Sequence, residues 1–296
     1  MRHLQKIRYI GVMQADPQQL PHLLALLDDQ DPAVRNQVHE ALRAFGDNLE
    51  HLLTPYLEDL SPVTMQQVQH WCAEIRVERF KTHWLDWLDL DDDKRALEEA
   101  LGWLSYLQAD WAPDPLRDLL DQLARRYRER YPESSVQDMM AFLFVDQGFL
   151  PPERDYYHPR NSNLVTVIHR RRGLQISLAC VTILVGERLG LAVEGFNMPG
   201  HFMVMADDAG MVMLFDVFNQ GQPLPAQAHA YLEQSLTTQE VSLHDLQARS
   251  HQIVLRVLRN LINAYQHKQN HDQMRFFQSL LEQLVAALQT RGIDLA

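Results

Sequence analysis

The chain has 296 residues, of which 46% are apolar and 22% are charged, a composition typical of an ordinary globular protein. Its formal net charge of -12 argues against general binding to nucleic acid or to anionic lipid, because such binding needs clustered positive charge. The length suffices for two or three compact domains, each with a core of its own.

The cysteine content and the apolar runs bear on the compartment. Cys72 and Cys180 are the only cysteines, so a disulfide framework is not expected, which fits a reducing compartment. The first eight residues hold no apolar core of signal-peptide length, and no later apolar run approaches the roughly 18 residues of a membrane-spanning helix. We therefore expect a cytoplasmic protein without a membrane segment.

The N-terminal part predicts a helical hairpin. Residues 20–27 place apolar side chains on one helical face, and a second amphipathic stretch ends near Phe45. Asp31 can cap this second helix with Pro32 at its first position, where the missing N–H costs nothing. Gly46 suits the left-handed conformation that ends many helices.

A weaker copy of the hairpin follows, with one apolar-periodic stretch at 49–57 and another from Pro62 towards Arg76. The spacing resembles HEAT repeats, in which a turn like Asp-Pro-Ala-Val-Arg at 31–35 joins two helices and the units stack through their apolar faces. The resemblance covers roughly residues 10 to 85. It implies an N-terminal helical-repeat domain over residues 1–85.

The next part of the chain also reads as helical, with apolar spacing at 96–107, 116–127 and 135–144. An acidic cluster precedes the first of these stretches and consists of Asp89, Asp91, Asp92 and Asp93. We interpret it as a helix entrance whose carboxylates accept free N–H groups, because the glycine and the distal glutamate of a calcium loop are missing.

The pattern changes after residue 190. Residues 193–196, 201–206 and 211–217 are short, rich in β-forming residues and separated by turn signals, so they predict an antiparallel sheet. The tail at 250–288 returns to helical spacing and predicts a helical hairpin. The fold class is therefore α+β, with a helical start, a central domain with a small sheet, and a helical end.

Three residues of the central part stand in an order known from cysteine-nucleophile catalysts. Gln175 begins a predicted helix, His201 begins the second strand of a hairpin, and Asp216 lies on the next strand. In papain-like and transglutaminase-like sites a cysteine occupies the helix start, a histidine deprotonates it, and an acid orients the histidine. The helix start favours thiolate because it is the positive end of the helix dipole.

Several motifs resemble one family. They are Gly173-x-x-x-Ser177-Leu-Ala, Leu189-Gly-Leu191, Pro199-Gly-His-Phe202, Phe215-Asp-Val-Phe-Asn-Gln-Gly221, Tyr156-Tyr-x-Pro-Arg-Asn-Ser162 and Leu258-Arg-Asn-Leu261. Together they are similar to the transglutaminase-like core and tetratricopeptide-like tail of the bacterial SirB-type invasion-regulator family. The resemblance covers roughly residues 95 to 290. It implies a transglutaminase-like (papain-like) domain over 86–249 and a tetratricopeptide-like hairpin over 250–296.

Aligned on the wider transglutaminase motif, Gln175 takes the place of the cysteine, and an amide cannot act as a nucleophile. The resemblance thus implies that His201 and Asp216 remain as base and orienter, or as their vestige, while the attacking atom is missing. Two residues offer an alternative nucleophile. Cys180 should point away from His201 and lie too deep in the helix, and Ser177 should satisfy free N–H groups in the first turn.

A polar ligand site is a further expectation. Gln175 would donate into a small pocket for a peptide or a carboxylate, and the residues around it would be Tyr156, Tyr157, Arg160 and Asn161. His158, His169 and His201 lack a diagnostic metal-ligand spacing, and we expect neither a metal nor another cofactor.

Two functional hypotheses remain open. The favoured one is a non-catalytic module that binds a protein or peptide partner or has a regulatory role, with no nucleic-acid or membrane partner. The alternative is an enzyme of acyl transfer or amide hydrolysis in which His201 is the base, Asp216 orients it, and Ser177 or Cys180 attacks. The sequence leaves the oligomeric state undetermined.

Overall fold

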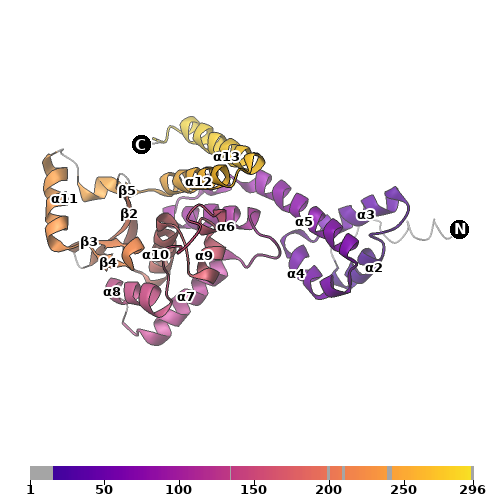
Figure 1. The fold of residues 1–296 in the computed structure, drawn as a ribbon, viewed down its shortest axis with the longest axis horizontal. Coiled ribbons are helices and arrows are strands. Elements are labelled where there is room, and N and C mark those ends of the chain that lie inside the picture. The colour runs from indigo at the N-terminus through magenta and orange to yellow at the C-terminus, as the bar shows by residue number, and fades with distance from the viewer. Residues whose placement is uncertain (1–15, 134, 199–200, 209–210, 239–241, 295–296) are drawn as a thin grey trace. The chain divides into compact units, whose positions relative to one another are not determined.

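The computed structural model describes residues 16–294, apart from 134, 199–200, 209–210 and 239–241. The chain forms two compact units (Figure 1). Unit 1 contains the described residues up to Trp84 together with the segment Ala109–Pro113, and unit 2 contains Leu85–Gln108 and the chain from Asp114 onward. The return of residues 109–113 to unit 1 was not foreseen from the sequence.

Unit 1 consists of helices and short 3-10 turns. Its elements are η1 (Pro17–Gln19), α2 (Leu20–Ala25), α3 (Pro32–Arg43), η2 (Gly46–Asn48), α4 (Leu49–Leu53), η3 (Thr54–Asp59) and α5 (Pro62–His83). The apolar residues that the sequence placed on helical faces form one core, which includes Leu20, Leu27, Val38, Leu53 and Val68. Burial of these faces is the main force that holds the short helices together.

Local signals decide where these helices begin and end. The Asp31 carboxylate accepts the Ala33 N–H at 2.9 Å, so the predicted cap of α3 is confirmed. Gly46 has φ +59°, the left-handed conformation expected for it. The predicted helix at 49–57 was too long, because Pro55 has no N–H to donate, and the chain continues as the 3-10 turn η3.

A buried ion pair attaches the 109–113 segment within unit 1. The Glu50 carboxylate pairs with the Arg76 guanidinium, and the two side chains are only 9% and 6% exposed. The other Glu50 oxygen accepts the Ala112 N–H at 2.7 Å, and Arg76 donates to the Ala109 carbonyl. Trp111 adds a hydrogen bond of 3.1 Å from its indole N–H to the Thr54 hydroxyl.

Unit 2 combines helices with one sheet. Its helices and helical turns are η4 (Asp86–Asp89), α6 (Asp93–Leu107), α7 (Leu116–Arg130), α8 (Val136–Met140), the π-helical turn η5 (Ala141–Asp146), η6 (Pro159–Asn161), α9 (Leu164–Arg170), α10 (Gln175–Leu189), η7 (Val217–Asn219), α11 (Ala226–Thr238), η8 (Leu243–Leu246), α12 (Ser250–His267) and α13 (His271–Thr290). Its strands are β1 (Val193–Met198), β2 (His201–Asp208), β3 (Met211–Asp216), β4 (Gln222–Pro223) and β5 (Gln247–Ala248).

The sheet is antiparallel, with the strand order β4-β3-β2-β1-β5. Helix α10 packs on β1 and β2, and every residue from Ile176 to Gly186 is buried. Apolar residues of the strands also pack with Leu243 and Leu232, so η8 and α11 contribute to a second cluster (Figure 1). The predicted mixture of helices and a small antiparallel sheet is confirmed.

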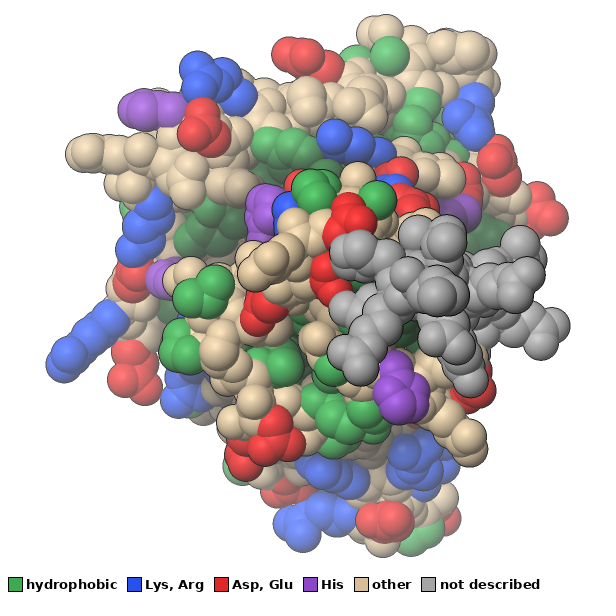
Figure 2. Space-filling view, turned by 90° about the vertical axis from the view of Figure 1, so that its right-hand side faces the viewer, with side chains coloured by type: hydrophobic (Ala, Val, Ile, Leu, Met, Phe, Trp, Pro, Cys, Tyr) green, Lys and Arg blue, Asp and Glu red, His purple; other side chains and the backbone are tan. Residues whose placement is uncertain are grey.

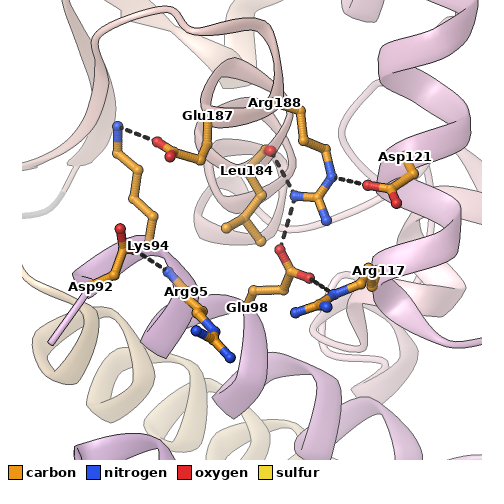
Figure 3. A network of polar contacts seen from close by, with 9 residues as sticks. All are labelled: Asp92, Lys94, Arg95, Glu98, Arg117, Asp121, Leu184, Glu187 and Arg188. Atoms are coloured by element: carbon orange, nitrogen blue, oxygen red, sulfur yellow. Dashed lines mark hydrogen bonds and ion pairs between the residues drawn. The ribbon is translucent and has the colours of Figure 1, made fainter. Parts of the chain in front are cut away.

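An ionic network links α10 to two other helices (Figure 3). The Arg188 guanidinium binds Asp121 of α7 at 2.6 Å and Glu98 of α6 at 2.9 Å. Beside it, Asp92 accepts the Arg95 N–H at 2.7 Å, so one member of the acidic cluster does cap α6. The network fixes the end of α10 opposite to Gln175.

The C-terminal hairpin is part of unit 2, and its helix α12 packs on α6. Helices α12 and α13 lie against each other, with the Tyr265 and Phe277 rings stacked at 5.3 Å. The start of α12 is held by Asp93 of α6, whose carboxylate accepts both the N–H and the hydroxyl of Ser250. The predicted helices of the tail are therefore confirmed, and they are in the same compact unit as the sheet.

The face shown in Figure 2 is mixed in charge, with acidic and basic side chains of the described residues scattered over it. Within the same residues, no helix has both the length and the apolar character needed to cross a membrane.

Candidate functional site at the start of helix α10

A glycine and a backbone hydrogen bond position the first turn of α10. A Cβ on Gly173 would lie 2.8 Å from a methyl carbon of Val167, so a larger residue would force the chain away from α9. Leu174 is extended, and its N–H donates to the Asn161 carbonyl at 3.0 Å. The helix therefore begins at Gln175, as the sequence predicted, with its side chain against His201 of β2.

His201 and Asp216 form a half-buried pair. The Asp216 Oδ2 atom lies 3.2 Å from Nε2 of His201, and the two side chains are 26% and 35% exposed. The other carboxylate oxygen accepts the N–H groups of Phe218 at 2.9 Å and Asn219 at 3.3 Å. Because the turn after β3 holds one oxygen, the carboxylate is fixed, and its second oxygen lies against the imidazole.

The Gln175 amide lies on the imidazole. Its nitrogen is 3.0 Å from Nδ1 and 3.0 Å from Nε2 of His201. The two ring nitrogens flank the same ring carbon, so a group equidistant from both does not lie along the lone pair of either one. At this distance an in-plane approach would collide with that carbon. The amide nitrogen therefore lies out of the plane of the ring, over its face, and not along the lone pair of either ring nitrogen.

Cys180 lies deep in α10. Its side chain is fully buried, and burial raises the pKa of its thiol. A thiol becomes nucleophilic as the thiolate, which this environment disfavours. The structure thus places Cys180 in the helix core, as the sequence suggested for a residue five positions beyond Gln175.

Ser177 is committed to the backbone of the preceding loop. Its hydroxyl donates to the Asn161 carbonyl at 2.9 Å, and the residue is 2% exposed. We expected this hydroxyl to satisfy free N–H groups of the first turn, and in the structure it donates to the Asn161 carbonyl, which also accepts the Leu174 N–H. The serine proton is therefore directed at Asn161.

The loop before α9 supplies the other predicted pocket residues. Asn161 is 2% exposed, and its amide donates to the carbonyls of Asp155 and Tyr156 at 3.0 Å each. It supports the loop and does not face an open pocket. Tyr156 and Tyr157 are 46% and 40% exposed, and Arg160 is exposed as well.

The same loop is tied to the C-terminal hairpin. The Tyr157 ring stacks on the His267 ring with centroids 3.7 Å apart. Lys268 donates to Asp155 at 2.6 Å, and this hydrogen bond lowers the pKa of the Asp155 carboxyl. The His158 Nδ1 accepts the Arg160 N–H at 3.1 Å, and burial lowers the pKa of His158. His158 thus acts as a cap for η6.

The sequence analysis gave no role to Arg256 or to Asn197, which the structure brings together. Arg256 of α12 donates to the Asn197 side-chain oxygen at 2.7 Å, and its guanidinium lies 5.4 Å from the centre of the Phe202 ring. Helical spacing predicted a helical hairpin at 250–288, but it carried no signal for which strand Arg256 would reach. The adjacent motif Leu258-Arg-Asn-Leu261 was the only hint that this helix matters.

Two hollows lie elsewhere. One of about 430 Å³ lies between α12 and α13 and is lined by Arg259, Ile262, Asn263, Gln266, Gln278, Leu281 and Glu282. One of about 400 Å³ lies in unit 1 and is lined by Pro21, Leu24, Ala25, Asp28, Tyr56, Asp59, Leu60, Ser61 and Thr64. Neither is lined by Gln175, His201 or Asp216.

Metal-ligating side chains do not gather in the described ranges. Within residues 16–294, less the gaps named above, no three His, Cys, Asp or Glu side chains are arranged to hold an ion. His169 instead lies 2.9 Å from the Asp114 carboxylate, on the surface.

A buried helix packed on an antiparallel hairpin thus brings Gln175, His201 and Asp216 together. A sequence model described as the Transglutaminase-like superfamily matches residues 114–259. The domain around Gln175, His201 and Asp216 is therefore transglutaminase-like.

The chain belongs to the UPF0162 protein family. A UPF0162 protein of Xylella fastidiosa strain Temecula1 is 31% identical over 230 residues, which cover 71% of this chain and 80% of that protein. The UPF0162 protein of strain 9a5c is 32% identical over 204 residues, 62% of this chain and 72% of its own length. Human F-box only protein 21 is 29% identical over 109 residues, 34% of this chain and 17% of that protein. No solved structure matches the chain significantly.

Proposed function

We propose that the transglutaminase-like domain is a non-catalytic module that binds a protein or peptide partner or has a regulatory role. The observation that carries the proposal is the Gln175 amide nitrogen 3.0 Å from both ring nitrogens of His201. A carboxamide in that position has no ionisable proton and no nucleophilic atom, so the His201–Asp216 pair has nothing to activate. The pair then serves to hold the amide in place.

The two alternative nucleophiles support the same proposal. Cys180 is fully buried with a raised pKa, and the Ser177 hydroxyl is committed to the Asn161 carbonyl. The competing proposal of acyl transfer or amide hydrolysis keeps one supporting observation, the 3.2 Å contact between His201 and Asp216. For that reason the test must look for chemistry directly.

A finer assignment goes with this proposal. We infer that the family is of the SirB type, that unit 1 is HEAT-like, and that α12 and α13 form a tetratricopeptide-like hairpin. The predicted domains at 1–85, 86–249 and 250–296, and a cytoplasmic location, remain part of the same proposal. The segment that matches human F-box only protein 21 covers 17% of that protein. Its presence within a longer chain supports the proposal that this segment is a module.

The first experiment looks for a nucleophile. The full chain is treated at pH 7.5 with a thiol-directed probe and, separately, with a fluorophosphonate, and adducts are weighed by mass spectrometry. We expect no adduct that depends on His201. An adduct that is lost both in Cys180→Ala and in His201→Ala, or both in Ser177→Ala and in His201→Ala, would overturn the proposal in favour of an enzyme.

The second experiment tests whether Gln175 fills the nucleophile position. The Gln175→Cys variant should gain a thiol at a helix start beside an imidazole, with a pKa lowered towards the roughly 3.5 to 7.5 range of such thiols. It should react with iodoacetamide at pH 6 much faster than free cysteine does. The matched control, Gln175→Cys with His201→Ala, should lose most of this gain. Equal reactivity in the two variants would show that His201 does not act on that position.

A further inference from the structure

Arg256 is a half-buried cation that has no carboxylate partner within the described residues. Its only hydrogen bond among the described residues goes to the neutral side chain of Asn197, at 2.7 Å. The guanidinium also lies over the Phe202 ring, 5.4 Å from its centre. Burial lowers the pKa of Arg256, Tyr156 raises it, and the positive charge of Arg259, one turn along α12, lowers it again, with a net lowering.

This situation favours an anion. A guanidinium has five N–H donors in a planar fork, and Asn197 accepts from one nitrogen. A partly buried charge without a counter-ion is unfavourable, and a carboxylate that binds the free side of the fork removes the imbalance with two parallel hydrogen bonds. One guanidinium neutralises one carboxylate, whereas a phosphate dianion requires more positive charge.

The fork lies on one face of the β1–β2 strand pair. Asn197 of β1 is opposite Phe202 of β2, and Arg256 contacts both side chains. Met198 is opposite His201, and because neighbouring residues of a strand point to opposite faces, the register puts Asn197 and Phe202 on the other face of the strand pair from His201. The anion site at Arg256 is therefore distinct from the Gln175–His201 pair.

We infer that Arg256, together with Asn197, binds a carboxylate at the β1–β2 strand pair. The inference goes beyond the proposed function, because Arg256 and Asn197 are not part of the Gln175–His201 pair. The carboxylate can belong to the C-terminus of a peptide or to an acidic side chain, and the two sources share the same chemistry at Arg256.

The test is a titration of the full chain by nuclear magnetic resonance. The first probe is N-acetylglycine, which presents a terminal carboxylate. The second is the α-amide of N-acetylglutamate, which presents only a side-chain carboxylate. Inorganic phosphate at equal ionic strength is the anion control. We expect saturable shifts of the Arg256 Nε–H and of the backbone amides of Asn197 and Phe202. The tighter of the two carboxylates identifies the source.

Variants separate the site from general charge. Arg256→Gln should weaken carboxylate binding by at least about tenfold, and Arg256→Lys, which keeps the charge but not the fork, should weaken it by a smaller factor. The matched control is Arg275→Gln, which removes an exposed arginine on α13 and should bind as the wild type does. Unchanged amide shifts away from the site establish that each variant is folded.

Three results would overturn the inference. They are the absence of saturable shifts with either carboxylate, equal binding to phosphate, and unchanged affinity in Arg256→Gln. None of these depends on the labelling experiments above. Failure of the titration with no covalent adduct would leave the non-catalytic proposal standing, and an adduct that depends on His201 would refute that proposal even if carboxylates bind.

Discussion

Replacement of Glu50 by glutamine should destabilise unit 1 more than any exposed change of the same kind. The substitution keeps the shape of the side chain but removes the charge that faces Arg76, whose side chain is 6% exposed. Removing one partner of a buried ion pair typically costs about 3 to 5 kcal/mol, because the other charge stays buried without compensation. The amide oxygen can still accept one hydrogen bond, which returns about 1 kcal/mol.

The expected loss is therefore about 2 to 4 kcal/mol in the free energy of unfolding of unit 1. Since a domain is typically stable by only about 5 to 15 kcal/mol, this is a large fraction of the total. The loss should extend to residues 109–113, because Glu50 also accepts the Ala112 N–H and Arg76 donates to the Ala109 carbonyl.

Native-state amide hydrogen exchange on the full chain measures the effect, because it reads the opening free energy of α4 and α5 separately from that of unit 2. The matched control is Glu40→Gln, which removes an exposed acid paired with Arg43 and should change stability by no more than about 1 kcal/mol. The double variant Glu50→Gln with Arg76→Met removes both charges and should be more stable than Glu50→Gln alone. A loss below about 1 kcal/mol in Glu50→Gln, or a further loss in the double variant, would refute the reasoning.

Three other predictions concern the rest of the chain. Burial raises the pKa of Cys72 to about 12 and also raises the pKa of Cys180, so both thiols stay protonated at pH 8. A disulfide reagent at pH 8 should therefore detect no thiol in the native protein and two thiols in urea. Gly221→Ala should lower stability by about 1 to 3 kcal/mol in denaturant unfolding, because Gly221 has φ +66° and an added Cβ would collide with Phe144; wild-type stability would contradict this. Arg188→Met should cost about 1.5 to 3 kcal/mol by the same measurement, because Asp121 loses this cation and Glu98 keeps only Arg117. A neutral result would show that the network contributes nothing.

Much of the local structure followed from the sequence alone. The period of apolar residues predicted most helices and the three long strands, since an element that buries one face has apolar residues at a regular spacing whatever that face packs against. The caps at Asp31 and Asp92 could be predicted because each carboxylate accepts an N–H group only two or three residues further along the chain. Helix α11 was missed, because its exposed residues, such as Tyr231, give little apolar period, and the short strands β4 and β5 carry no periodicity.

The sequence gives glutamine at position 175, and the contacts of this side chain depend on the fold. Sequence order placed Gln175, His201 and Asp216 on successive elements, but it could not give the position of the amide over the ring face. The polar residues predicted around a pocket proved to have separate tasks, with Asn161 supporting its own loop and Tyr157 stacked on His267. Side-chain direction in a loop depends on distant partners, which local pattern does not encode.

The sequence by itself determined most elements, the caps at Asp31 and Asp92 and the presence of an amide at residue 175, because these are local features of the chain. Only the tertiary structure decided that residues 109–113 belong to unit 1 and that Arg256 reaches β1. Both contacts join segments more than 20 residues apart. Which faces meet at such separations depends on the packing of the whole core, and no local period records it.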